Sequence, residues 1–125
     1  MTSKKDKSYI DENGQKWDSR EECAVYNWFI QEGYEGRFEL QYKFIPNRKF
    51  KSDFAFVKEK VLLEAQGLDI RGVGGHNNIF QYAKDCTRML IAAAHGWLVL
   101  YWAKGVTKSD LLCNLDKILK LRSEL

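Results

Sequence analysis

The sequence predicts an α/β protein with a mixed central sheet of about four strands that helices flank. Segments 50–57 and 61–67 have strand composition and enclose the charged turn Lys58-Glu-Lys60, which is typical of an antiparallel hairpin. A helical pattern and then an apolar strand at 97–102 follow. The helix between these strands makes a crossover, so we expect the last strand to pair in parallel and to lie centrally in the sheet.

Turn, capping and periodicity signals predict the other elements. Asn13-Gly14 between two short strand-like pairs indicates an N-terminal hairpin. Ser19 and Glu22 have the spacing of a capping box, and Thr107 with Asp110 begins a C-terminal helix in a similar way. The expected elements are a hairpin at 9–17, a helix at 19–33, a strand at 38–44, a helix at about 78–95 and a helix from 107 onward.

The helix expected at 78–95 has one apolar and one polar side. The apolar side is expected to face the core, as in most surface helices. It consists of Ile79, Tyr82, Ala83, Cys86, Leu90 and Ala93. The polar side consists of Gln81, Lys84, Asp85 and Arg88.

Length and composition indicate one domain spanning residues 1–125, with residues 1–7 as a flexible basic arm. The three cysteines form no CxxC pair, so neither a zinc site nor a disulfide framework is expected. No apolar run is long enough to cross a membrane and no apolar stretch follows the N-terminal charges, which favours a cytoplasmic protein. The net charge of +3 permits binding to nucleic acid without requiring it.

The two central strands each carry a polar side chain where a strand is normally apolar. Because side chains alternate along a strand, Asp53 lies opposite to the face of Phe54, and Glu64 shares a face with Gln66. A two-residue turn would place Asp53 across from Glu64, and a four-residue turn would place it across from Gln66. Two carboxylates on one half-buried patch repel each other unless a hard divalent cation neutralises them. The pattern therefore predicts a metal site.

A simpler interpretation exists for part of this pattern. An isolated Asp in a strand is often a solvent-facing residue at an edge, and this would explain Asp53 alone. Glu64 is harder to explain in that way, because it interrupts Val-Leu-Leu just before Gly67, where a buried strand would end. Asp53, Glu64 and Gln66 together favour a functional site.

The order of these elements and motifs resembles the PD-(D/E)XK nuclease superfamily, in particular small phage and mobile-element endonucleases of its very-short-patch-repair-like and junction-resolvase-like branches. The resemblance covers about residues 9–103. It implies a restriction-endonuclease-like αβββαβ core. The motifs that carry it are Trp17-Asp-Ser-Arg-Glu-Glu22, Leu40-Gln-Tyr-Lys-Phe44, Asp53-Phe54, Glu64-Ala-Gln-Gly67, Gly74-Gly-His76, Asp85-Cys86 and Gly96-Trp97.

The resemblance implies a Mg²⁺- or Mn²⁺-dependent endonuclease that hydrolyses DNA phosphodiester bonds. Asp53, Glu64 and the backbone carbonyl of Ala65 would hold the metal and leave positions for phosphate and water. The sequence departs from the family pattern at Gln66, where a Lys is usual, and at Ser52, where the family's name has a proline. Gln66 can orient a water but cannot supply positive charge. Arg88 or Lys84 on the following helix could supply it instead.

The resemblance also points to residues around this centre. Glu22 would position the metal or a water, although helix capping alone explains its spacing from Ser19. His76 could contact phosphate or water, or be an ordinary polar loop residue, and Gln41 could lie near the site or face solvent. The residues expected to bind nucleic acid are His76, Arg71, Lys51 and Lys84, with further basic residues at Lys4, Lys5, Lys7, Arg48 and Lys49 that are solvated charges in the simpler interpretation.

Two other functions remain open at this point. The fold could be a catalytically weak or inactive nucleic-acid-binding module, which the Gln66 departure favours. It could also be a nuclease that acts on RNA or on DNA ends. A single active site cuts one strand, so double-strand cleavage would require a homodimer.

Overall fold

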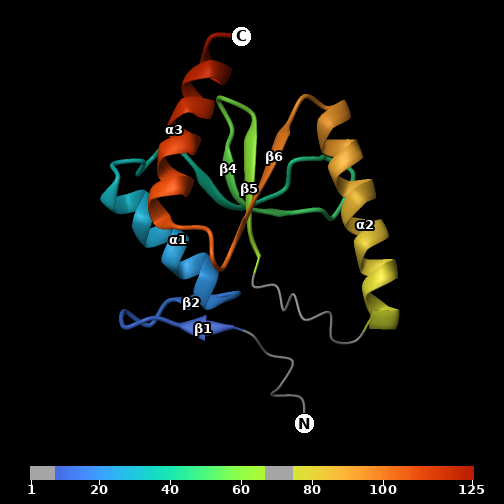
Figure 1. Ribbon diagram of the computed structural model, residues 1–125, viewed down its shortest axis with the longest axis horizontal. Helices are drawn as coiled ribbons and strands as arrows, with labels where there is room; N and C mark the ends of the chain where they lie inside the picture. Colours follow the sequence, from blue (N-terminus) through green and yellow to red (C-terminus); the bar gives the residue numbers. More distant parts are fainter. Residues whose placement is uncertain (1–7, 67–74) are drawn as a thin grey trace.

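The computed structural model describes residues 8–66 and 75–125, with only the backbone described at position 66 and over 75–78. The predicted basic arm at 1–7 therefore lies outside the described residues. The chain forms six strands and three helices in this part (Figure 1). They are β1 (Tyr9–Ile10), β2 (Lys16–Trp17), α1 (Arg20–Gln31), β3 (Glu39–Tyr42), β4 (Ser52–Phe56), β5 (Val61–Gln66), α2 (Gly75–Ala94), β6 (Leu98–Ala103) and α3 (Lys108–Ser123).

The predicted α/β class with a mixed four-stranded sheet is confirmed. The sheet order is β3-β4-β5-β6, with antiparallel pairing up to β5 and parallel pairing between β5 and β6. The predicted N-terminal hairpin is also present as β1 and β2, and it forms a separate two-stranded sheet. The expectation of a central position for the last strand is wrong, since β6 lies at an edge of the described sheet. Its apolar composition reflects contact with both core clusters, through Leu98, Trp102 and Val99, rather than a strand on each side.

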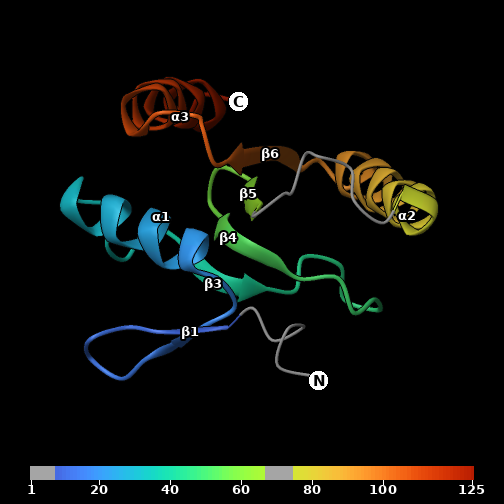
Figure 2. The ribbon, with the colours of Figure 1, turned by 60° about the horizontal axis from the view of Figure 1, so that its bottom comes forward.

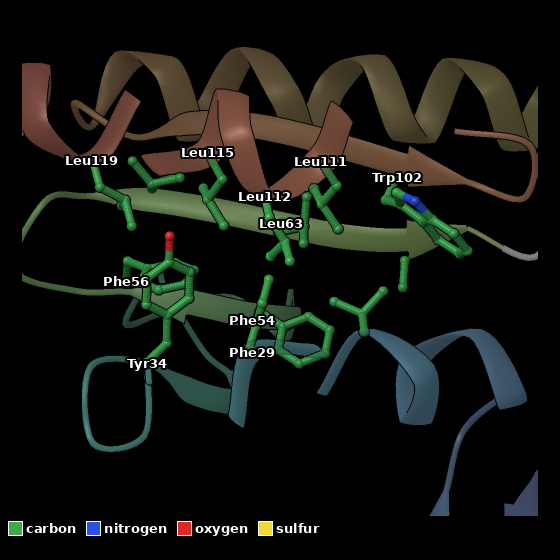
Figure 3. Packing of buried hydrophobic residues seen from close by; sticks show 13 residues of the cluster. Phe29, Tyr34, Phe54, Phe56, Leu63, Trp102, Leu111, Leu112, Leu115 and Leu119 are labelled. Carbon is green, nitrogen blue, oxygen red and sulfur yellow. The ribbon is translucent and has the colours of Figure 1, made fainter. Parts of the chain in front are cut away.

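The helices cover the two faces of the sheet, with α1 and α3 on one face and α2 on the other (Figures 1 and 2). The main core lies under α1 and α3, where Phe29 and Leu115 converge on Phe54 and Leu63 (Figure 3). All four side chains are at most 1% exposed. Side chains alternate between the two faces along β4 and β5. The ones on the face of α1 and α3 are Phe54, Phe56, Val61, Leu63 and Ala65, as the sequence predicts.

A smaller apolar cluster fills the opposite face, under the C-terminal half of α2. It contains Ala55 and Leu62 of the sheet, Ala92 of α2, and Trp97 just before β6. Ala92 is fully buried, so the end of α2 is fixed against the sheet. Among the described helices, none combines the length and apolar character needed to span a lipid bilayer.

The predicted orientation of α2 is wrong. Ile79, Tyr82 and Leu90, which were expected to face the core, are 70–72% exposed. Arg88 of the polar side lies toward the sheet instead and forms an ion pair with Glu64, whereas Gln81 and Lys84 are exposed. The physical reason is that the sheet face beneath α2 carries Asp53 and Glu64. An apolar stripe placed there would leave the buried Glu64 without its ion-pair partner Arg88.

Candidate metal centre

The β4–β5 hairpin sets the two predicted carboxylates side by side. Phe54 pairs with Leu63, and continuing this antiparallel register places Asp53 opposite Glu64. This is the register expected for the shorter of the two turns considered above. The turn is closed by the Lys60 N–H, which donates to the Val57 carbonyl at 3.2 Å, with Lys60 in the left-handed region at φ 61°. Local turn geometry thus determines which side chains meet at the far end of the hairpin.

Asp53 is half-buried and held by two hydrogen bonds. Its Oδ2 accepts from the Ala65 backbone N–H at 2.9 Å, and its Oδ1 accepts from Gln41 Nε2 at 3.2 Å. The first bond ties the carboxylate to the end of β5, immediately beside Glu64. The second ties it to β3. Asp53 is therefore fixed between its two neighbouring strands rather than free in solvent.

Glu22 is only 3% exposed and takes part both in the helix cap and in the site. Its backbone N–H donates to Ser19 Oγ at 3.1 Å, which confirms Ser19 as the N-cap of α1. Its Oε1 accepts from the Asp18 N–H at 3.1 Å, one residue before the cap, and its Oε2 accepts from Gln41 Nε2 at 2.7 Å. Glu22 therefore belongs to the helix cap and also contacts Gln41 beside Asp53, while its positioning of a metal or a water stays a prediction.

Gln41 joins the carboxylates of Glu22 and Asp53 through a single amide nitrogen. It lies in the left-handed region at φ 48°, between the paired residues Leu40 and Tyr42 of β3. A non-glycine residue in this region costs on the order of 1 kcal/mol or more, and such strain tends to concentrate at functional sites. The sequence left open whether Gln41 faces solvent, and the structure places it in the site.

Three carboxylates form a cluster that could hold a metal ion. Asp18, Glu22 and Asp53 each have an oxygen within 4.8 Å of the others. Such a set of hard oxygen donors matches the preference of Mg²⁺ and Ca²⁺. Asp18 was not among the predicted ligands. Its position directly before the N-cap of the helix that carries Glu22 was the available signal.

Glu64 lies outside this triad and is paired with Arg88 instead. Arg88 Nη1 is 3.2 Å from Glu64 Oε2, and the same nitrogen donates to the Lys51 carbonyl at 3.0 Å. Tyr101 of β6, which was also not predicted, is in register with Glu64 in the parallel pair. Burial raises the pKa of the Tyr101 phenol. The charge of Arg88 and a hydrogen bond with it lower that pKa, but by less. The centre therefore has an acidic half around Asp53 and an ion-paired half around Glu64.

Burial raises the pKa values of the carboxyl groups of Glu64, Asp53 and Glu22. The pKa of Glu64 rises to about 7, because desolvation and the charge of Asp53 outweigh the attraction of Arg88. Desolvation also raises the pKa of Asp53 against hydrogen bonds from Ala65 and Gln41, and it raises the pKa of Glu22. Partly desolvated carboxylates of like charge are the arrangement that a bound cation stabilises most.

Other residues predicted to act here have different outcomes. Lys51 and Lys84 are exposed, and Lys51 contributes its backbone carbonyl to Arg88. Gln66 ends β5, but its side chain lies outside the described part of the chain. Arg71 and the side chain of His76 also lie outside it. Their predicted contacts with nucleic acid or phosphate therefore stay predictions.

Comparisons with known proteins add no relative to this picture. No protein-family model matches the chain. No curated protein and no solved structure matches it significantly.

The raised carboxyl pKa values predict that the metal-free protein loses stability as pH rises. A folded-state pKa above the unfolded value means that the folded chain binds more protons, so stabilisation is complete below about pH 4.5 and is lost as pH rises through about 7. For Glu64 the effect is on the order of 1–3 kcal/mol. Urea unfolding at pH 5 and pH 8 in EDTA measures it. Glu64→Gln should reduce the change in unfolding free energy between pH 5 and pH 8. An unchanged difference would contradict the assignment of this effect to Glu64.

Proposed function

We propose that the protein is a Mg²⁺- or Mn²⁺-dependent endonuclease that hydrolyses DNA phosphodiester bonds, and that it belongs to the PD-(D/E)XK superfamily. The observation that carries the proposal is the environment of the Asp53 carboxylate. This carboxylate is partly desolvated, pinned to the Ala65 N–H, and directly beside Glu64 across the hairpin. The sequence motifs around it, including Glu64-Ala-Gln66, support the same family.

The residues present fit a hard divalent cation. Asp53 and Glu64, with the backbone carbonyl of Ala65, would hold it from adjacent strands. When bound, the cation supplies charge stabilisation for the phosphate and lowers the pKa of a coordinated water. The acidic triad fits the same chemistry, because its oxygens converge within 4.8 Å. Asp53 is the residue that both sets share.

Neighbouring side chains would orient the ligands and balance the charge. Gln41 fixes Asp53 relative to Glu22, and a ligand held in this way loses less freedom when it binds a metal. Arg88 brings a guanidinium to the site through its ion pair with Glu64, and this would supply the positive charge that Gln66 lacks. Guanidinium nitrogens can bind phosphate oxygens in a bidentate manner and stabilise the negative charge that develops during hydrolysis.

Basic residues beside the centre support DNA as the substrate. Lys51 immediately precedes β4 and is exposed, and Lys84 lies one helical turn before Arg88 on α2. Arg88 contacts the Lys51 carbonyl, so these two segments are neighbours at the site. Exposed cations that flank an acidic centre can hold the phosphate backbone while the metal acts on one phosphate.

This placement predicts a salt-dependent contribution to binding. Lys51→Ala and Lys84→Ala should each weaken binding of a short duplex in Ca²⁺ by about threefold to tenfold at low salt. The slope of log affinity against log salt should fall by about one for each lysine. Fluorescence anisotropy over a salt series measures both quantities. Lys117→Ala on α3 is the control, and a similar loss in that variant would mean that the lysines act only through net charge.

A cleavage panel tests the function directly. Supercoiled, linear, single-stranded and branched DNA, together with RNA, would be incubated with Mg²⁺ or Mn²⁺ and with EDTA. We expect metal-dependent cleavage of at least one DNA substrate by the wild type and none by Asp53→Asn. Cleavage of RNA or of free ends alone would instead assign the third function considered above. Cleavage by Asp53→Asn at the wild-type rate would mean that Asp53 does not hold the catalytic metal.

A second candidate is a nucleic-acid-binding module on the same fold. The Glu64–Arg88 ion pair favours it, because this pair neutralises Glu64 without a cation. Among the described residues, no buried polar side-chain atom lacks a hydrogen-bond partner, which also suits a binding module without a metal. Tight DNA binding in EDTA, unchanged by Mg²⁺ and without cleavage, would establish this function instead.

A further inference from the structure

The outward side of α2 is apolar and exposed along most of the helix. Ile79, Phe80, Tyr82 and Leu90 are each 70–72% exposed, and Met89 is 38% exposed. Ala83, Ala93 and Ala94 are exposed between or after them. Figures 1 and 2 show α2 at the outside of the molecule, with the sheet on one side and no described element on the other. This set of residues is called the α2 stripe below.

The α2 stripe has the spacing of a helix-pairing seam. Ile79, Ala83, Leu90 and Ala93 of the stripe, with the partly buried Cys86 between them, follow one another at intervals of four, three, four and three residues. This is the heptad spacing that keeps one seam of a helix in contact with a partner helix. The side of α2 that faces the sheet is occupied by Ala92 and Arg88, so the seam is not used within the described part of the chain.

The α2 stripe is complementary to itself in the antiparallel direction. Large side chains begin the stripe at Ile79 and Phe80 and recur at Leu90, and small ones lie at Ala83, Ala93 and Ala94. A twofold axis between Cys86 and Thr87 would set Leu90 against Ala83, and would set the neighbouring Ile79 and Phe80 against the neighbouring Ala93 and Ala94 of the second copy. Large side chains would then enter the spaces left by small ones. A parallel pair would instead place large against large and alanine against alanine, which leaves gaps.

The area and charge of the α2 stripe also fit a second copy of this chain. An aromatic side chain presents about 150–250 Å², so the stripe offers on the order of 500–800 Å² per copy, close to the ~800 Å² per partner of a stable interface. The stripe contains no Lys or Arg, which does not suit nucleic acid or an anionic membrane surface. An isologous interface needs only one such self-complementary surface.

We propose that the α2 stripe is the interface of a homodimer in which the two α2 helices pack antiparallel about a twofold axis near Cys86. The interface lies on the side of α2 opposite to Arg88. Dimerisation therefore leaves the metal centre of each copy open. This inference does not depend on the proposed nuclease function, and its test requires neither metal nor DNA.

Mass in solution tests the interface. Light scattering after gel filtration should give twice the 14.6 kDa chain mass for the full-length wild type at micromolar concentration. Leu90→Glu should weaken the dimer at least about 30-fold and yield a monomer with an unchanged circular dichroism spectrum. Leu121→Glu on α3 is the matched control, because Leu121 is 66% exposed and lies outside the stripe. A dimer that persists in Leu90→Glu overturns the proposal.

Cross-linking tests the symmetry independently of any folding defect. A short bismaleimide should join two chains through Cys86, so the product should persist in Cys113→Ser and disappear in Cys86→Ser. In the Cys86→Ser background, Ile79→Cys should cross-link to Ala93→Cys in a mixture of the two proteins and not to itself. Self-linking of Ile79→Cys would overturn the antiparallel arrangement. A wild type that stays monomeric at about 100 μM overturns the dimer, whatever then covers the stripe.

Discussion

Asp53→Asn is expected to abolish metal-dependent DNA cleavage, with a loss of at least about 10³-fold in rate, while the protein stays folded. The amide is a weaker ligand and carries no charge, so the cation loses the residue that both acidic sets share. The amide oxygen can still accept a hydrogen bond from the Ala65 N–H, so the link between β4 and β5 should survive. In EDTA, the variant should be slightly more stable than the wild type, because the variant relieves repulsion among desolvated carboxylates.

The comparison of Glu64→Gln with Glu22→Gln determines where the metal binds. If Asp53, Glu64 and Ala65 are the ligands, Glu64→Gln should weaken Mn²⁺ binding by at least about tenfold and abolish cleavage. Glu22→Gln should then weaken binding by less, since Glu22 acts through Gln41. Isothermal titration calorimetry with Mn²⁺ measures the affinities. A larger loss in Glu22→Gln or Asp18→Asn would place the cation in the triad of Asp18, Glu22 and Asp53 instead. Full cleavage by both Asp53→Asn and Glu64→Gln would refute the site.

The sequence predicted the fold well because most of its signals are local. Ser19 and Thr107 cap their helices as expected, and both accept from a backbone N–H three residues ahead. The hairpin between β4 and β5 follows from two apolar runs around a charged turn. Its alternation then assigns Asp53 and Glu64 to one face without knowledge of any tertiary contact. Parallel pairing of β6 follows from the length of the crossover.

Features that depend on tertiary context could not be predicted in the same way. The position of Gln41 in the site depends on a left-handed backbone conformation, which a Gln in an alternating strand does not indicate. The orientation of α2 was predicted incorrectly because amphipathic periodicity identifies an apolar side but not the partner that covers it. The carboxylates of the sheet attract the polar side of α2, and Arg88 then compensates the charge of Glu64.

Arg88→Ala is expected to slow cleavage by about 10- to 1,000-fold without weakening metal binding at alkaline pH. Arg88 Nη1 lies 3.2 Å from Glu64 Oε2 and lowers the pKa of that carboxyl group, although burial holds this pKa near 7. Removing the guanidinium should raise the pKa of Glu64 further. Protons should then compete better with Mn²⁺ at pH 7, whereas at pH 8.5 the unpaired carboxylate should bind it at least as tightly as in the wild type.

A purely structural role for Arg88 would give a different pattern. If Arg88 only neutralises Glu64, then Arg88→Ala would free Glu64 to bind the metal. The cleavage rate of this variant at pH 8.5 would then equal that of the wild type. Arg88→Lys retains the charge and should recover part of the rate, but it loses the bidentate geometry. Lys117→Ala on α3 is the control, because Lys117 is exposed and lies outside the site, and it should change the rate by less than about threefold in saturating DNA.

Gln66→Ala completes the test, because Gln66 stands where the proposed nuclease family usually has a lysine. A residue that only orients the attacking water should contribute about 10- to 100-fold to the rate and almost nothing to Mn²⁺ affinity. If Arg88 supplies the charge that Gln66 lacks, Arg88→Ala should be at least as damaging as Gln66→Ala. Single-turnover rates at pH 8.5 compare the two. Full activity in both variants would mean that neither residue takes part and that Asp53 and Glu64 act through the metal alone.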